Sequence, residues 1–224
     1  MNPVKIVEIK EDIRSRNNAR ASEIRENLLR RKIFFLNVMS SPGSGKTTFI
    51  VNLVNRLKKD FSIGVIEADI DSDVDAKTID ALTGVKTVQI HTAGACHLTC
   101  QMSGEALDAL GTEGLDMVVL ENIGNLVCPA EFDTGATKNL VLLSVPEGDD
   151  KPLKYPLMFE VASAVAVTKS DVAPAFDFSF EQVEKNIRLR NGDIPVFFTS
   201  AVKNEGMDAV EKYVRQEINK VKNA

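Results

Sequence analysis

The feature that most constrains this fold is the octapeptide SSPGSGKT at residues 40–47. An apolar run, IFFLNVM, begins at Ile33 and ends directly before it, and an amphipathic helical pattern over residues 47–59 follows it. A strand, a glycine-rich turn and a helix in this order predict a P-loop, in which backbone N–H groups and the helix N-terminus surround phosphate oxygens. The usual first glycine of the pattern is Ser40 here, which requires that this position has no positive φ.

The side chains of the P-loop indicate how it holds a nucleotide. Gly43 and Gly45 leave room for the phosphates, Lys46 reaches the β- and γ-phosphates, and the hydroxyl of Thr47 binds Mg²⁺. We assign a catalytic role to Lys46 as well. The expected nucleotide contacts in this segment are Pro42, Gly43, Ser44, Gly45, Lys46, Thr47 and Thr48.

Apolar runs and helical patterns alternate along the rest of the chain. Such runs are typical of strands covered on both faces, and their alternation with helices is typical of a doubly wound sheet. We therefore predict an α/β fold with a mostly parallel sheet, made of an N-terminal helical segment (residues 1–31) and a P-loop domain (residues 32–224). The further strands are expected at residues 61–68, 87–90, 117–120, 140–145, 163–168 and 195–200, and helices at 98–110, 180–190 and 207–222.

Composition and charge limit the kinds of binding partner and the cell compartment that we expect. A net charge of −5 gives no basic field for nucleic acid or an anionic membrane. The first twenty residues are charged throughout, and the chain lacks the run of about 18 apolar residues that spans a bilayer. The odd number of three cysteines does not suggest a disulfide framework. We expect a cytoplasmic protein that binds neither nucleic acid nor membrane.

Two acidic residues end apolar runs where a parallel sheet would place them near the phosphates. Asp69 closes VIEAD and Glu121 closes MVVLE. Either carboxylate can hold Mg²⁺ directly or through water, and the N–H of Gly124 can meet the γ-phosphate. We predict catalytic roles for Asp69, Glu121 and Gly124, against the alternative that both acids are solvated loop residues.

Base selection is indicated by two later segments. The tetrad TKSD at residues 168–171 resembles the Asn-Lys-x-Asp motif of GTPases, in which the aspartate accepts hydrogen bonds from guanine and the lysine stem covers the base. Asp171 and Lys169 would fill these roles, and a carboxylate left unpaired penalises the wrong base. Ser200 and Ala201 resemble the second guanine-contacting loop. Thr168 replaces the asparagine of the motif, so the sequence does not decide whether a side chain still connects this segment to the P-loop. From the two segments together we predict GTP as the nucleotide.

Three residues form a pattern suited to a transition metal. Cys96 and His97 lie in the loop TAGACHLTC, and Cys128 lies seven residues after Glu121. Two thiolates and an imidazole suit Zn²⁺ or Ni²⁺. A structural role, with buried cysteines and a hydrogen-bonding histidine, is the alternative. Cys100, one helical turn after Cys96, either joins the site or packs in the core.

Several longer segments resemble the hydrogenase nickel-incorporation GTPases, the HypB family, within the SIMIBI class of P-loop GTPases. The resemblance covers about residues 33–221 and rests on SSPGSGKTT, VIEADI, GACHL, ENIGNLVCPAEFD, LSVPEGDDKPLKYPLMF, TKSD and TSAVKNEGMDA. The related urease GTPases have Cys-Pro-His where this chain has Cys96 and His97 adjacent, which favours hydrogenase.

The resemblance implies a function and partners. Cys96, His97 and Cys128 would bind nickel or zinc near a subunit contact, while Asp69 and Glu121 would serve magnesium and switching. It also implies GTP hydrolysis to GDP, a GTP-dependent homodimer, and two partners, the accessory nickel chaperone HypA and the hydrogenase large-subunit precursor.

The short spacing from Glu121 to Cys128 predicts a coupling mechanism. GTP would draw Glu121 and Gly124 toward the phosphates and favour a dimer that completes the metal site, and hydrolysis would release nickel. No catalytic glutamine or arginine finger is evident, so we expect slow turnover without an activator. The alternatives are a urease-type nickel-insertion GTPase, a P-loop kinase and a nonhydrolysing nucleotide-gated metal sensor.

Overall fold

The computed structural model describes residues 9–224, with side chains from residue 14 onward. Residues 1–8 of the predicted N-terminal segment lie outside the described part. The strands are β1 (Phe34–Met39), β2 (Ile63–Asp69), β3 (Lys86–His91), β4 (Met117–Glu121), β5 (Lys138–Ser144), β6 (Ala164–Thr168) and β7 (Val196–Phe198). The helices are α1 (Ile9–Arg30), α2 (Lys46–Leu57), α3 (Val74–Thr83), α4 (Cys100–Leu110), α5 (Cys128–Glu131), α6 (Lys151–Lys154), α7 (Pro156–Glu160), α8 (Phe180–Arg188) and α9 (Met207–Asn223), with 3-10 helices η1 (Val145–Glu147) and η2 (Ser170–Ala175).

The seven strands form one sheet in the order β3-β2-β4-β1-β5-β6-β7. Every pair of neighbouring strands is parallel. The predicted α/β doubly wound sheet is confirmed, and its seven strands occur where the apolar runs predicted them. Because all strands point the same way, the loops that follow β1, β2, β4, β6 and β7 meet at one edge of the sheet.

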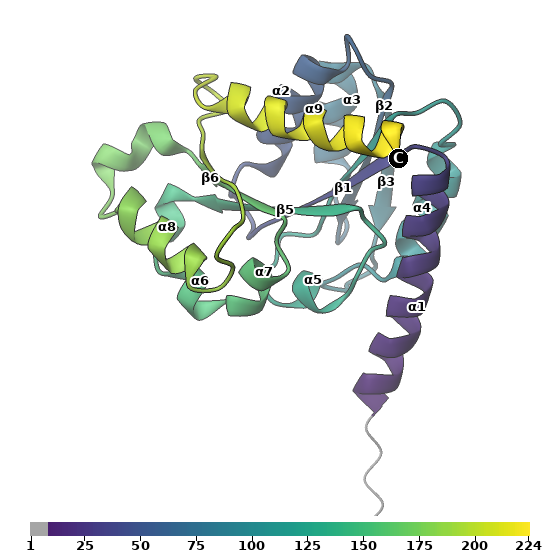
Figure 1. Ribbon diagram of the computed structural model, residues 1–224, viewed down its shortest axis with the longest axis horizontal. Coiled ribbons are helices and arrows are strands. Elements are labelled where there is room, and N and C mark those ends of the chain that lie inside the picture. The colour runs from purple at the N-terminus through teal and green to yellow at the C-terminus, as the bar shows by residue number, and fades with distance from the viewer. Residues whose placement is uncertain (1–8) are drawn as a thin grey trace, which may run out of the picture.

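Helices cover both faces of the sheet (Figure 1). On one face, α2, α3 and α9 pack against the side chains of Phe34, Leu36 and Val38 in β1. On the other face, α4 packs against Phe35 and its neighbours, and α7 and α8 pack against β5 and β6. This double cover explains why the central strands read as unbroken apolar runs.

Helix α1 runs along the side of the domain beside α4, and its first turns project beyond the other elements (Figure 1). Ala21 and Leu28 are buried in this contact. A side chain on Gly135 would lie 2.8 Å from Ile24, so the helix sits directly on the backbone there. The division of the chain between residues 31 and 32 stays a prediction. None of the helices within residues 9–224 combines the length and the apolar character needed to cross a bilayer.

Candidate nucleotide and metal site

The P-loop joins β1 to α2, and α2 begins at Lys46. Gly43 and Gly45 adopt φ values of 73° and 94°, a left-handed conformation that favours glycine. Ser40 is buried and is not among the residues with positive φ, so the missing first glycine causes no strain. Its hydroxyl instead accepts a hydrogen bond from Ser44 Oγ at 2.5 Å. The loop therefore has the backbone shape that cradles phosphate oxygens.

The TKSD segment is tied to the P-loop by two side chains. Thr168 Oγ1 donates to the carbonyl oxygen of Ser44 at 2.8 Å, and Lys169 Nζ donates to the carbonyl oxygen of Gly43 at 2.7 Å. Lys169 itself has a left-handed backbone, with φ of 57°. A side-chain bridge between the TKSD segment and the P-loop is therefore present. The Thr168 hydroxyl makes it, in place of the amide of the usual asparagine.

The second predicted base loop lies beside the first. The backbone N–H of Ser170 donates to Thr199 O at 3.0 Å, which joins the TKSD segment to the end of β7. Ser200 and Ala201 follow at once, and the carbonyl of Ala201 accepts from Asn52 in α2 at 2.9 Å. Asp171 lies in the first turn of η2. The structure thus brings the P-loop and both predicted base loops to one edge of the sheet.

Glu121 ends β4 almost completely buried, with 1% of its surface exposed. Its Oε1 accepts a hydrogen bond from Thr47 Oγ1 at 3.0 Å. Its Oε2 is buried and has no hydrogen-bond partner within the described chain. A carboxylate in contact with the P-loop threonine and with one free oxygen fits a cation bound between them.

Sequence reasoning missed a second buried carboxylate, Glu67 in β2, which is 2% exposed. It lies directly opposite Glu121 in the parallel register, so the two side chains share one face of the sheet. Carboxylate oxygens of Glu67, Asp75 and Glu121 all lie within 4.8 Å of one another. The signal was present in the sequence, since Glu67 interrupts a buried apolar strand.

Burial controls the protonation of this acidic pair. It raises the pKa of Glu67 to about 8, with a further contribution from the neighbouring Glu121. Burial likewise raises the pKa of Glu121 to about 7, while Lys46 and Thr47 act in the opposite direction. Each of the two carboxyl groups has one buried oxygen without a hydrogen-bond partner among the described residues, and two such groups side by side favour either shared protons or a divalent cation.

Asp69 lies at the end of β2 as predicted, but its carboxylate is outside this group of three. Its Oδ1 accepts the backbone N–H groups of Asp71 and Ser72 at 3.0 and 2.8 Å. These backbone hydrogen bonds lower the pKa of Asp69. Its carboxylate shapes the loop between β2 and α3, and its predicted magnesium and catalytic role stays a prediction.

The loop after Glu121 is pressed against the P-loop. A Cβ on Gly124 would lie 2.9 Å from both the Cα and the nitrogen of Pro42, so only glycine allows this approach. The next residue, Asn125, donates its backbone N–H to Ser40 O at 2.8 Å. The segment from Glu121 to Cys128 therefore contacts the phosphate loop through its own backbone.

The three predicted transition-metal ligands come together. Donor atoms of Cys96, His97 and Cys128 lie within 4.8 Å of one another, and the two sulfurs are 3.1 Å apart. The His97 ring stacks on Phe132 with 3.9 Å between centroids. Burial lowers the pKa of His97, which favours the neutral imidazole that binds metals. This donor set fits Zn²⁺ or Ni²⁺.

Cys100 does not join these ligands. It begins α4, is 4% exposed, and is absent from the group of donor atoms that the other two cysteines form with His97. Burial raises the pKa of its thiol, as expected for a cysteine that packs in the core.

A family model described as the CobW/HypB/UreG nucleotide-binding domain matches residues 34–198. The hydrogenase/urease maturation factor HypB of Helicobacter pylori strain 26695 is 42% identical over 214 residues, which are 94% of this chain and 87% of that protein. The hydrogenase maturation factor HypB of Escherichia coli K12 is 40% identical over 208 residues, which are 93% of this chain and 71% of that protein.

Solved structures agree with these matches. The crystal structure of HypB from Helicobacter pylori in complex with nickel is similar with a TM-score of 0.86 and 39% identity, covering 92% of this chain and 96% of that one. HypB from Archaeoglobus fulgidus gives a TM-score of 0.84 at 29% identity, covering 91% and 99% of the two chains. The signal recognition particle receptor FtsY of Elizabethkingia anophelis, with a TM-score of 0.54 and 17% identity over 81% and 65%, shares the fold alone. The resemblance inferred from the sequence motifs is therefore confirmed, and the chain belongs to the HypB branch of the CobW/HypB/UreG family of nucleotide-binding proteins.

Proposed function

We propose that this protein is a cytoplasmic GTPase that carries nickel and delivers it during [NiFe]-hydrogenase maturation, with GTP binding and hydrolysis controlling the transfer. The proposal includes a GTP-dependent homodimer, and as partners an accessory chaperone of the HypA kind and the hydrogenase large-subunit precursor. The relatives named as hydrogenase and urease maturation factors support this direction. The proposed cargo is Ni²⁺, held by Cys96, His97 and Cys128, a set that also accepts Zn²⁺.

The proposed work of the nucleotide site is divided among its residues. P-loop amides and Lys46 hold the β- and γ-phosphates, while Asp171 and the loop at Ser200 and Ala201 select guanine. Thr47 and Glu121 would hold Mg²⁺, with Glu67 and Asp75 beside them. Bound Mg²⁺ supplies charge neutralisation for the phosphoryl group leaving GDP. Water accepts that group, and the products are GDP and phosphate.

The proposed coupling between nucleotide state and nickel binding rests on one observation. Gly124 lies against Pro42 with no space for a side chain, four residues before the metal ligand Cys128. A change at the phosphates that moves Pro42 or Glu121 must therefore move the segment that ends in Cys128. Nucleotide state is thereby expected to alter the geometry, and so the affinity, of the nickel site.

The test is a nickel titration of the wild-type protein, with GDP and with a nonhydrolysable GTP analogue. We expect the affinity or the stoichiometry to differ between the two nucleotide states. Cys128→Ala should lose the site, whereas Cys100→Ala, the matched control at a buried cysteine outside the donor group, should keep it. Identical wild-type affinities and stoichiometries in both states would contradict the coupling.

Three rival functions predict different products or acceptors. A P-loop kinase would place phosphate on a metabolite instead of releasing it, and a nonhydrolysing sensor would release none. Release of inorganic phosphate from GTP, at a rate that falls in Lys46→Ala, would exclude both. Some relatives are named for urease as well as hydrogenase, so nickel transfer should be measured to apo-hydrogenase and to apo-urease. Preferential transfer to apo-urease would mean that urease, and not hydrogenase, is the acceptor.

A further inference from the structure

Asn17 on α1 connects the two loops that carry the proposed nickel ligands. Its side chain is 7% exposed and uses both of its polar atoms. Oδ1 accepts the backbone N–H of Cys100 at 2.9 Å, at the end of the loop that carries Cys96 and His97. Nδ2 donates to the carbonyl oxygen of Asp133 at 2.8 Å, five residues after Cys128.

The bond to Cys100 is a helix cap supplied by a distant segment. Cys100 is the first residue of α4, and the side chain of the N-cap residue Thr99 accepts the N–H of Met102, not that of Cys100. The N–H of Cys100 is one of the helix's initial donors with no partner in the helix itself. Asn17, 83 residues away, satisfies it. The start of α4, and with it the end of the Cys96–His97 loop, is therefore fixed by α1.

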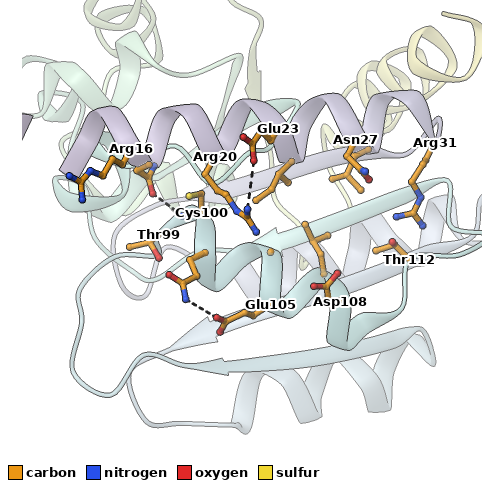
Figure 2. Close-up of a pocket in the computed structure, with 16 residues that line it drawn as sticks. Arg16, Arg20, Glu23, Asn27, Arg31, Thr99, Cys100, Glu105, Asp108 and Thr112 are labelled. Atoms are coloured by element: carbon orange, nitrogen blue, oxygen red, sulfur yellow. Dashed lines mark hydrogen bonds and ion pairs between the residues drawn. The ribbon is translucent and has the colours of Figure 1, made fainter. Parts of the chain in front are cut away.

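Other α1 side chains hold the second loop. Arg25 forms an ion pair with Asp133 at 2.5 Å and donates Nε to Ala136 O at 2.8 Å. Arg14 pairs with Glu131 at 2.6 Å. Figure 2 shows α1 lying across α4, with Cys100 beneath the turn between the labelled Arg16 and Arg20. A cavity of about 760 Å³ lies along this helix pair, and Asn17 is among the residues that line it.

The two ligand loops touch directly through the thiols of Cys96 and Cys128 and through the His97 ring, which stacks on Phe132. Asn125 Nδ2 donates to Cys96 O at a long 3.4 Å. Metal sites depend on ligand positions to within about 0.2 Å, so a connection that sets the spacing of two ligand loops affects affinity. Asn17 is a buried side chain that hydrogen-bonds to both loops.

We propose that Asn17 is a positioning residue for the nickel site, which sets the separation of the Cys96–His97 loop from the Cys128 loop and makes nickel affinity depend on how α1 is seated. This inference rests on the proposed nickel function. A partner that shifts α1 would then change nickel affinity without contacting the metal.

The experiment compares nickel affinity of the full-length wild type, Asn17→Ala, Asn17→Asp and Asn18→Ala, by competition with a metal chelator. Asn17→Ala is expected to weaken nickel binding about tenfold, the lower end of what is usual for residues that orient metal ligands. Asn17→Asp keeps the acceptor for Cys100 but loses the donor to Asp133, so its affinity should also fall. Asn18→Ala, an exposed neighbour of the same type, should match wild type.

Two further measurements separate positioning from general stability. GDP affinity should be unchanged in Asn17→Ala, and the thiolate-to-nickel charge-transfer band should shift in energy or intensity at saturating nickel. If Asn17→Ala and Asn17→Asp bind nickel as wild type does, the inference is wrong even if their melting temperatures fall. If both variants fail to fold, Arg25→Lys, which shortens the reach to Asp133 and Ala136, must still weaken nickel binding, and unchanged affinity there overturns the inference. A wild type that binds no nickel, or that keeps it in Cys128→Ala, would instead refute the proposed function.

Discussion

Thr168 and Ser44, separated by 124 residues of sequence, are joined by a hydrogen bond of 2.8 Å from the threonine hydroxyl to the serine carbonyl. Both residues are buried. The loop proposed to read the base is thus fastened to the loop proposed to hold the phosphates.

Removal of this hydroxyl should weaken nucleotide binding. Thr168→Val preserves the shape but leaves the buried Ser44 carbonyl unpaired, at a cost of about 1–3 kcal/mol. We expect GDP affinity, measured with a fluorescent analogue, to fall about tenfold, since 1.4 kcal/mol is a factor of about ten. Thr168→Ser keeps the hydroxyl and should stay near wild type. Equal affinity in the valine and serine variants would show that the bond does not matter for binding.

Gly124→Ala should disturb the contact between the P-loop and the loop that carries Cys128. The new Cβ would lie 2.9 Å from backbone atoms of Pro42, so one loop must move. Overpacking of this kind costs about 1–3 kcal/mol in the free energy of unfolding. We expect a comparable loss in chemical denaturation together with weaker GTP binding. Gly192→Ala, where the structure has no atom within 4 Å of the added carbon and φ is not positive, is the matched control.

Asp171→Asn should change the preferred base. An asparagine amide cannot accept both guanine donors, but it can pair with the extra carbonyl of xanthine. We expect GTP affinity to fall roughly 100-fold or more, as is usual when a site loses its hydrogen-bonding match, and xanthosine triphosphate to bind better than GTP. Hydrolysis assays with both nucleotides check this. A variant that still prefers GTP would remove Asp171 from the base site.

The buried pair Glu67 and Glu121 should make the nucleotide-free, magnesium-free protein less stable as pH rises. The pKa of Glu67 is raised to about 8 by burial and by Glu121, so the folded state holds a proton that the unfolded state has released. The stabilisation is complete below the unfolded pKa, near 4.5, and is lost as pH rises through about 8. The expected slope is about 1.4 kcal/mol per pH unit for each proton retained.

Glu67→Gln is the corresponding test. The amide is neutral at every pH, so the free energy of unfolding should depend less steeply on pH between 5 and 8 than in wild type. Urea denaturation at several pH values, without nucleotide or magnesium, measures the slope. An unchanged slope would mean that Glu67 is already ionised in the folded protein at neutral pH.

The sequence predicted most of the architecture because the central strands are covered on both faces. Continuous apolar runs such as IFFLNVM and MVVL predict buried strands, and the octapeptide at residues 40–47 predicts the edge of the sheet at which the candidate nucleotide site lies. Helix α3 and the short helices α5, α6 and α7 were not predicted. Each of the three short helices has a proline at its first or second position and only four or five residues, too few for a hydrophobic period to be visible.

The missed parts of the site have a common cause. Glu67 acts beside Glu121 only because β2 and β4 are neighbours in register, a pairing between strands far apart in the sequence. Asn17 and Cys100 meet only because α1 packs on α4. Proposed ligands within one loop, such as Cys96 and His97, were recognisable from spacing, whereas these partners depend on tertiary packing.

The parallel sheet also indicates where a label can be attached without obstructing the candidate nucleotide and metal loops. All of the chemistry described lies beyond the carboxyl ends of the strands, so the turns that lead into the strands face away from it. Glu113, in the turn before β4, has 86% of its side chain exposed. A surface tether or a dye attached there would leave both the nucleotide and the metal loops accessible, which makes single-molecule observation of their movement practical.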